Sequence, residues 1–432
     1  MSDATARTLA GSWPSAGWSR RIAMRLLHRL EYGTLTIVES SGRRTFGRPG
    51  PDGIHATMHV NDPVVWRTVL TRGSAGLGET YVDGAWESDD LVDLLRLLAL
   101  NLDRLTRFTD RLVSVRNAAA RPVRQLRRPT KADDRRNVHS HYDLGNEFFE
   151  LFLDPTMAYS CGVYESDAAT LAEASSAKFD RICHKLNLGP ADHVVEIGGG
   201  WGGFALHAAS RYGCHVTTTT ISARQFDYAT RAVAAAGLTD RITVLNKDYR
   251  DLDGQFSHLV SIEMIEAVDW QLHDAFFAAC ARLLRPDGRA ALQCIVIDDR
   301  EFERAKTRKD FIKRFIFPGG CLPSITAITM ATARASDFRL IDLEDIGRHY
   351  ARTLADWRRR FEDRWSDARA LGFDDGFLRM WRFYFAYCEA GFLERRVSDV
   401  QVVLARSGWR GDLGPPWSVE RPTNDPTRVR AT

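Results

Sequence analysis

Five of the six residues from 198 to 203 are glycines, and the sixth is Trp201. A largely apolar run at residues 193–197 precedes them, and a helix-like segment at 204–211 and a Thr-rich, β-branched run at 216–221 follow. Glycine adopts positive φ without steric cost and lets backbone N–H groups approach a ligand closely. The order strand, glycine turn, helix, strand predicts the opening of a parallel, nucleotide-binding sheet, so the expected fold class is α/β.

The letters of the glycine turn do not by themselves identify its ligand. Gly198, Gly200 and Gly203 match the dinucleotide fingerprint, but such a site usually has an acid about 20 residues further on. The sequence there reads Thr-Ile-Ser, with Gln225 one turn into the next helix. An acid, Glu196, stands instead just before the glycines. A carboxylate in that place suits a cationic, phosphate-free ligand, and we therefore predict S-adenosylmethionine.

Composition narrows the class of protein. The chain has 432 residues, of which 44% are hydrophobic and 27% charged, as in ordinary globular proteins, and its length predicts two domains. No apolar run reaches the ~18 residues of a membrane-spanning helix, and the first residues lack the apolar core of a signal peptide. Seven scattered cysteines without a CxxC spacing predict reduced thiols, a cytoplasmic location and no metal site.

The first part of the chain has the pattern of a small α+β domain at residues 18–115, followed by an arginine-rich linker at 116–136. Residues 18–30 are amphipathic, with arginines away from the apolar side. They form either a packed helix with a solvated basic face or a helix on an anionic membrane surface. The linker is either a solvated connection or a contact for lipid phosphate groups. Because no basic surface interleaved with aromatic residues follows, we expect no nucleic acid partner.

Residues 137–410 continue the α/β pattern and place polar side chains where strands end. Asp248 and Tyr249 follow the third predicted strand, at the edge where open α/β sheets bind ligands. Glu263 and Glu266 follow the next strand. A carboxylate is costly to bury unpaired, so one of these two should meet a ligand or a hydrogen-bond donor.

A short helix predicted at residues 146–153 has unusual flanks. The polar and aromatic residues around it are His139, His141, Tyr142 and Asp143 before it, and Tyr159, Ser160 and Cys161 after it. This concentration predicts a lid over the glycine turn, although His139 alone is expected to be structural. Apolar residues before a Pro-Gly-Gly turn at 318–320 predict the wall of a hydrophobic channel. The candidates for a dry aromatic pocket are Phe311, Phe315, Phe317, Trp381 and Tyr384.

Nine motifs occur in a fixed order along the chain. They are HYDLGNEFF, YSCGVY, VVEIGGGWGG, TISARQ, KDYRD, SIEMIEAV, FIFPGGCLPS, HYARTLADW and YFAYCEAGF, and with GLGETYVDGAW in the first domain they extend over residues 20–410. This set resembles the cyclopropane-fatty-acyl-phospholipid synthase family, which includes mycolic acid cyclopropane synthases and fatty acid methyltransferases of the tuberculostearic acid type. The resemblance implies a class I, Rossmann-like methyltransferase sheet. It also implies transfer of a methylene from S-adenosylmethionine to the cis double bond of an unsaturated phospholipid acyl chain, with bicarbonate as the base.

The resemblance also implies roles for individual residues. Contacts with S-adenosylmethionine, in addition to Glu196, are expected at Tyr159, Ser160, Gly198, Gly200, Gly202, Gly203, Thr220, Ile221, Gln225, Asp248 and Tyr249. Bicarbonate is expected between Cys161, Glu266, Gln293, the backbone at Ile295, and Tyr350. The implied catalytic residues are Glu266, Tyr350, Cys161, Gln293 and Cys388.

Two positions depart from a common family pattern. Gln293 stands where many members have His, and Ile265-Glu266-Ala267 stands where they have Phe-Glu-His. Gln can donate a hydrogen bond but does not titrate near neutral pH. The product is therefore open between a cyclopropane and a 10-methylene or 10-methyl branch made from an oleoyl chain. A saturated methyl branch would need a partner reductase.

The expected partners follow from this function. They are unsaturated phospholipid acyl chains, an anionic membrane surface that the protein touches peripherally, and a second copy of the chain, since the family leans towards homodimers. The non-enzymatic alternative is a peripheral lipid-binding protein. A small-molecule or RNA methyltransferase is possible on fold alone, but the aromatic C-terminal segment favours an apolar substrate.

Overall fold

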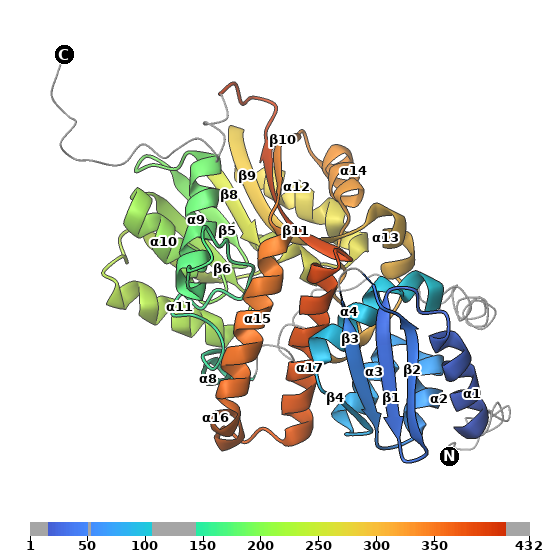
Figure 1. Cartoon of the computed structure of the whole chain (residues 1–432). Helices are drawn as coiled ribbons and strands as arrows, with labels where there is room; N and C mark the ends of the chain where they lie inside the picture. The colour runs from blue at the N-terminus through green and yellow to red at the C-terminus, as the bar shows by residue number, and fades with distance from the viewer. Residues whose placement is uncertain (1–15, 51–52, 106–143, 412–432) are drawn as a thin grey trace, which may run out of the picture.

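The structure, a computed structural model, describes residues 16–50, 53–105 and 144–411 (Figure 1). The first part holds a sheet with the strand order β2-β1-β3-β4 and a group of helices. The elements are α1 (Ala16–Leu27), β1 (Gly33–Glu39), β2 (Gly42–Arg48), β3 (His55–Val60), α2 (Val64–Arg72), α3 (Ser74–Val82), β4 (Trp86–Ser88) and α4 (Leu91–Leu100). The predicted α+β character is therefore confirmed for this part. The predicted linker at 116–136 and the end of the first domain lie outside the described residues.

Helix α1 is a packed helix with a solvated basic face. Its apolar side, including Met24 and Leu27, is buried in the core of the first domain. Arg20 binds the carboxylate of Glu39 on β1, with its Nε 2.9 Å from Oε2. The arginines on the exposed side are Arg21, Arg25 and Arg29. The first of the two interpretations of residues 18–30 therefore describes the fold, because the apolar side is already covered by protein.

The second part holds a larger, mostly parallel sheet. Its strands are β5 (His193–Ile197), β6 (His215–Thr220), β7 (Ile242–Asn246), β8 (Phe256–Ile262), β9 (Leu284–Ile297), β10 (Arg339–Asp345) and β11 (Val397–Ala405), in the order β10-β11-β9-β8-β5-β6-β7. Strands β5 to β9 pair in parallel, whereas β11 is antiparallel to both β9 and β10. The order reverses at β5, so the crevice at its carboxyl end is the place where such sheets bind ligands.

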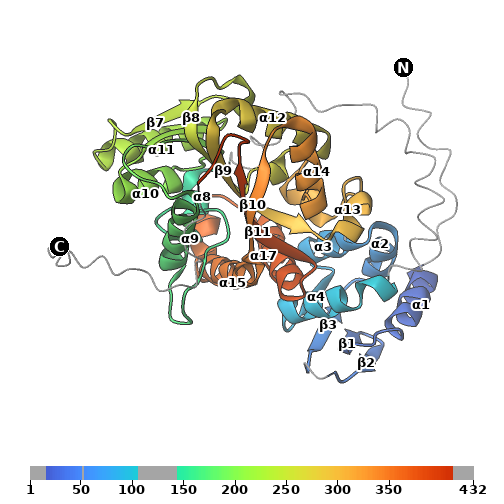
Figure 2. The same cartoon turned by 90° about the horizontal axis from the view of Figure 1, so that it is seen from above.

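Helices cover both faces of this sheet, as Figure 2 shows from above. On one side lie α9 (Leu171–Leu186), α10 (Gly203–Tyr212) and α11 (Ala223–Ala235), and on the other α12 (His273–Leu283), α13 (Asp299–Ala305) and α14 (Ile325–Ala335). Successive residues of β5 serve the two cores, because Val194 packs with the first group and Val195 with the second. The runs predicted at 193–197, 204–211 and 216–221 thus form β5, α10 and β6.

A helical hairpin joins the two parts of the molecule (Figure 1, orange to red). It consists of α15 (Gly347–Asp363), α16 (Trp365–Ala370) and α17 (Asp375–Leu393). Helix α17 packs against α15 and against α3 and α4 of the first domain. The contact is tight, since a Cβ added at Gly78 on α3 would lie 2.2 Å from Phe311 and 2.9 Å from Phe383. The first sheet, the helical hairpin and the segment before the glycine turn therefore share one continuous apolar core around α17, whereas the faces of the larger sheet have cores of their own.

One predicted element was wrong in extent. The helix expected at 146–153 ends early as α8 (Asn146–Phe149), because the N–H groups of Leu151 and Phe152 bond to carbonyls three residues back. Strand β9 includes residues 285–288, next to an irregularity in its pairing with β8. Strand β11 lies between β9 and β10. The short turns of helix are η1 (Tyr249–Asp251), η2 (Ile265–Ala267), η3 (Trp270–Leu272) and the π-helical η4 (Ile312–Ile316).

None of the described helices combines the length and the apolar character that crossing a bilayer requires.

Candidate active site

The glycine turn after β5 has the conformation that its sequence predicts. Gly198, Gly200 and Gly202 have φ values of 81°, 55° and 91°, in the region that favours glycine. A Cβ at Gly199 would lie 1.8 Å from the hydroxyl oxygen of Thr218, so the turn presses directly on the neighbouring strand. A Cβ at Gly200 would meet nothing within 4 Å. The turn is therefore closed towards the sheet and open on the other side, which fits the close approach of a cofactor.

Glu196 lies beneath this turn and is almost fully buried. Burial raises the pKa of its carboxyl to about 7, although a hydrogen bond from Thr218 and the charge of Lys178 oppose the rise. Its Oε2 atom has no hydrogen-bond partner among the described residues. A buried carboxyl with one oxygen left unpartnered can be stabilised in its charged form by a cationic ligand, which agrees with the predicted sulfonium.

The other predicted cofactor residues gather at the carboxyl ends of β6 and β7. The hydroxyl of Thr220 donates to Oε1 of Gln225 over 2.7 Å, and Ile221 follows directly. Asp248 accepts from Nε of Arg250 at 2.9 Å, while the ring of Tyr249 packs on Phe276. The structure thus brings these residues to the same sheet edge as the glycine turn. Their contacts with S-adenosylmethionine stay predictions.

Tyr159 and Ser160 belong to a second, more buried group of side chains. The hydroxyl groups of Tyr159 and Tyr384 lie 3.0 Å apart. Ser160 accepts a 2.5 Å hydrogen bond from the ammonium group of Lys178, which has no exposed surface. Burial lowers the pKa of Lys178, and the charge of Glu263 opposes this change. Lys178 on α9 is a buried cation that the sequence analysis did not identify.

The centre of the second group is the carboxylate of Glu263, directly after β8. Its Oε1 accepts from the backbone N–H of Cys161 at 2.7 Å and from Nε2 of Gln293 at 2.9 Å. Its Oε2 accepts from the hydroxyl of Tyr350 at 2.5 Å. The prediction that Glu263 or Glu266 meets a donor is therefore confirmed. Glu263 itself, however, was not among the predicted site residues.

Glu266 and Asp399 flank this carboxylate. Glu266 accepts through Oε1 from the backbone N–H of Ile295, and burial together with the charge of Glu263 raises its pKa to about 8. Burial and the same charge raise the pKa of Asp399 well above its ordinary value. Gln293 donates to Asp399 over 3.0 Å. In the described part of the chain, Glu266 Oε2 and Asp399 Oδ1 lack hydrogen-bond partners.

These contacts test whether the predicted residues can hold bicarbonate. Cys161, Gln293 and Tyr350 come together as expected, and so do Glu266 and the backbone at Ile295. They do so around a side chain rather than around an open ion site. Three of the expected donors already bind Glu263, and the fourth binds Glu266. The residues present therefore do not fit a bicarbonate ion between them.

The two cysteines predicted as catalytic are both protonated thiols. Burial raises the pKa of Cys161 and that of Cys388 strongly. The Cys161 thiol donates to the carbonyl of Gly162 over 3.2 Å, and Cys388 packs against the aromatic core on α17. A thiol is a weak nucleophile, so neither side chain is prepared for covalent catalysis. What Cys161 contributes to the site is its backbone N–H.

Aromatic rings surround the path from Tyr350 to Tyr159. The ring of Tyr350 stacks on Phe392 with centroids 4.4 Å apart and meets Trp357 at 6.0 Å. Trp357 in turn lies 5.2 Å from Tyr159. Of the five predicted pocket residues, Phe311, Trp381 and Tyr384 are buried, and Phe315 and Phe317 are partly buried against the same core. The rings predicted to line a dry aromatic pocket are therefore packed together beside the carboxylates, and the pocket itself stays a prediction.

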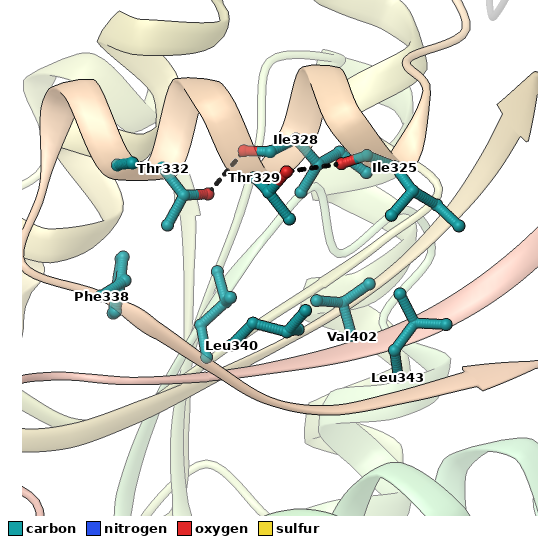
Figure 3. A pocket seen from close by; sticks show the side chains of 10 residues that line it. Ile325, Ile328, Thr329, Thr332, Phe338, Leu340, Leu343 and Val402 are labelled. Atoms are coloured by element: carbon teal, nitrogen blue, oxygen red, sulfur yellow. Dashed lines mark hydrogen bonds between the residues drawn. The ribbon is translucent and has the colours of Figure 1, made fainter. Parts of the chain in front are cut away.

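A separate apolar groove lies between α14 and the strands β10 and β11 (Figure 3). Its threonines, Thr329 and Thr332, donate their hydroxyl groups to the helix backbone, and so they do not offer donors to a ligand. None of the predicted site residues lines this groove. Of the predicted lid, His139, His141, Tyr142 and Asp143 lie outside the described residues.

Comparison with known proteins identifies the family to which the chain belongs. The model of the family described as mycolic acid cyclopropane synthetase matches residues 129–402. The chain belongs to this family. It is 38% identical over 408 residues to the tuberculostearic acid methyltransferase UfaA1 of Mycobacterium tuberculosis, covering 91% of this chain and 93% of that protein. It is 37% identical over 356 residues to the cyclopropane-fatty-acyl-phospholipid synthase of Escherichia coli, covering 81% and 88%.

Solved structures agree with this membership. The mycolic acid cyclopropane synthase CmaA1, complexed with SAH and CTAB, has a TM-score of 0.59 and 30% identity, and the match covers 63% of this chain and 98% of that chain. The protein is thus an S-adenosylmethionine-dependent methyltransferase with the class I α/β fold, as the resemblance predicted. The family's chemistry is the transfer of methyl or methylene groups to lipids.

Proposed function

We propose that this enzyme transfers a one-carbon unit from S-adenosylmethionine to the cis double bond of an unsaturated phospholipid acyl chain, with a cyclopropane as the product. The observation that carries this proposal is that the glycine turn and the buried carboxylate of Glu263 lie beside one group of aromatic rings, and we refer to this arrangement as the enclosure; its rings are Tyr159, Tyr350, Trp357 and Tyr384. On one side lies an open glycine turn above the buried Glu196. On the other side, aromatic rings lead to a buried carboxylate that accepts three hydrogen bonds.

Each part of this enclosure has a chemical task in such a transfer. When bound, S-adenosylmethionine supplies an electrophilic methyl group on its sulfonium. Because an alkene is a weak nucleophile, the enclosure must align the double bond with that methyl group. The addition leaves a carbocation on the acyl chain, which water would quench. The rings of Tyr159, Trp357 and Tyr384 exclude water and can stabilise the cation through their faces. A base must then remove a proton.

A second product is favoured by a specific comparison. The relative that matches 91% of the chain is named a tuberculostearic acid methyltransferase. In this alternative, hydride migration precedes proton loss, and the product is a 10-methylene chain that a partner reductase would saturate to a 10-methyl chain. The reading of the chain as a lipid-binding protein without turnover is wrong, since the chain belongs to a family of enzymes.

Lipid analysis of a host that expresses this chain tests the proposal and separates the two products. Both products add the mass of one CH₂ to the acyl chain. Mild catalytic hydrogenation leaves a cyclopropane unchanged but increases the mass of an exocyclic methylene by two hydrogens. An acyl chain without added mass, in a host that produces the folded enzyme, would refute the proposal.

The site of action is the second element of the proposal. We expect a cytoplasmic enzyme that touches an anionic membrane through basic residues of the first domain, since Arg21 and Arg25 on α1 are exposed. Binding to vesicles should therefore increase with anionic lipid content and decrease with salt. Co-sedimentation that is insensitive to both would contradict peripheral electrostatic binding. A homodimer is part of the same proposal, and sedimentation analysis of the purified chain tests it.

A further inference from the structure

We propose that the carboxylate of Glu263 is the catalytic proton acceptor of this enzyme and takes the place of a bicarbonate ion. This inference rests on the proposed function. It adds to that function the identity of the group that removes the proton in the last step of the reaction. It departs from the expectation that the resemblance gave, in which Cys161, Gln293 and Tyr350 surround a free anion.

The carboxylate of Glu263 occupies the site in which the anion was expected. The N–H of Cys161, the amide of Gln293 and the hydroxyl of Tyr350 converge, and three such donors can bind the two oxygens of an anion. The carboxylate of Glu263 meets all three, at 2.7, 2.9 and 2.5 Å. A carboxylate and a bicarbonate present the same pair of oxygens to such donors. The chain therefore supplies covalently the group that a bound ion would otherwise supply.

The backbone of Glu263 has an unusual conformation. Glu263 has a φ of 47°, which is uncommon for a residue with a side chain. Such strain persists where the surrounding structure enforces it, and it collects at functional sites. The N–H of Glu263 is held by the carbonyl of Gln293 at 2.7 Å. This backbone conformation directs the carboxylate to the donors from three different elements rather than along the strand.

The groups around Glu263 stabilise its carboxylate in the charged form. Lys178 is a fully buried cation whose charge favours the ionised form of Glu263, as does each of the three donors. Burial alone raises the pKa of Glu263, so the carboxylate is a stronger base than an exposed one. Asp399 and Glu266 also have raised pKa values, and both have an oxygen without a partner among the described residues. Glu263 is thus the carboxyl of this cluster that is best supported in its charged state.

Glu263 also lies in the right place for a catalytic base. The residue after Glu263, Met264, packs on the glycine turn, because a Cβ at Gly198 would lie 2.5 Å from its Cγ. Tyr350, which donates to Glu263, forms one end of the aromatic enclosure. The carboxylate therefore lies close both to the glycine turn and to the aromatic rings that we propose to hold the acyl chain. In the step proposed, a C–H bond of the carbocation breaks, its electron pair forms the new carbon–carbon bond, and the proton goes to a carboxylate oxygen of Glu263.

The experiment compares turnover of purified full-length enzyme with and without bicarbonate, on vesicles of an unsaturated phospholipid. The wild-type enzyme should keep its rate, within about twofold, in buffer depleted of carbon dioxide. Glu263→Gln, which has nearly the same shape but cannot accept the proton, should lose about 10²- to 10⁴-fold in kcat. Its affinity for S-adenosylmethionine, measured by calorimetry, should stay unchanged. Glu303→Gln on the exposed side of α13 makes the same chemical change and should keep full activity.

A second variant keeps the test decisive if Glu263→Gln is inactive for structural reasons. Glu263→Gly suits the positive φ and leaves the three donors without their acceptor. It should be nearly inactive in depleted buffer and regain at least about tenfold in rate when bicarbonate or formate is added.

The outcomes separate this inference from the function on which it rests. A wild-type enzyme that converts lipid but stops without bicarbonate would overturn the inference and leave the proposed function intact. The same holds if Glu263→Gln retains most of its activity. A wild-type enzyme that binds S-adenosylmethionine but never modifies lipid would overturn both.

Discussion

The hydroxyl of Tyr350 donates to the carboxylate of Glu263 over 2.5 Å and so joins helix α15 to the end of strand β8. The two residues are 87 positions apart in the sequence. The same carboxylate accepts from Cys161 and Gln293, which come from a loop and from β9. One side chain thus holds together the segments that surround the expected reaction centre.

Removing this hydroxyl with Tyr350→Phe should lower kcat by about 10- to 100-fold, because a hydrogen bond to a charged group contributes about 1.5–3 kcal/mol. The bond lowers the pKa of Glu263, so its loss should raise that pKa. Activity needs the charged carboxylate, and the acid limb of the kcat–pH profile should therefore move to higher pH. Other groups that act on Glu263 are Lys178, Gln293, Asp399, Glu266 and Cys161. A profile that does not move would mean that this bond has no part in proton transfer.

Binding of S-adenosylmethionine should depend on pH through Glu196. The pKa of this carboxyl is raised to about 7, so the group is neutral below that pH and charged above it. A cationic ligand favours the charged form, and affinity should be about tenfold weaker at about pH 6 than at about pH 8. Calorimetry on the enzyme without lipid measures this. Glu196→Gln should bind more weakly with a flat pH dependence; an unchanged slope would assign the effect to another group.

The closed side of the glycine turn should not tolerate a methyl group. In Gly199→Ala the new Cβ would lie 1.8 Å from the Thr218 hydroxyl oxygen and 2.8 Å from Glu196, so the turn must move. Affinity for S-adenosylmethionine should fall by at least about tenfold, since the backbone donors are displaced. Gly189→Ala is the matched control, because its Cβ would meet nothing within 4 Å. Equal affinities of the two variants would contradict this role of the turn.

Cys388 should be dispensable for chemistry. Burial keeps it protonated, and the transfer needs no covalent enzyme intermediate. Cys388→Ala should retain kcat within a factor of about three and lose some stability through the missing sulfur, by about 1 kcal/mol. Turnover and thermal unfolding are measured on the same preparation. A loss of kcat by orders of magnitude, in a variant that melts normally, would restore the catalytic assignment.

The shared core around α17 should make the two parts of the molecule unfold together. In Gly78→Ala the added Cβ would overlap Phe311 and Phe383, which should cost about 1–3 kcal/mol. Scanning calorimetry should then show one transition at a lower temperature. Gly17→Ala on α1, where a Cβ meets nothing within 4 Å, is the control and should not lower stability. Two separate transitions, only one of them affected, would refute a common core.

The sequence predicted best what is encoded locally. The glycine turn and its flanking strands follow from glycine placement and β-branched runs. Glu263 or Glu266 was expected to meet a ligand or a donor because a buried carboxylate needs one. The contacts themselves join residues far apart, as between Cys161 and Glu263, 102 positions apart, and no local pattern encodes them. Asp399 did leave a signal, since an acid stands within a largely apolar strand. The bicarbonate site was inferred from the resemblance to the family alone. A resemblance in sequence motifs does not show that the side chain of Glu263 occupies this site.

The fate of the methyl hydrogens tests most directly whether a base removes a proton from the transferred methyl group. Purified enzyme is supplied with S-adenosylmethionine carrying a CD₃ group and with vesicles of an unsaturated phospholipid, and the acyl chains are examined by mass spectrometry. We expect one added carbon that keeps two of its three deuterium atoms, because the base removes one from the transferred methyl group. Retention of all three deuterium atoms, or label in any molecule other than the acyl chain, would contradict this chemistry.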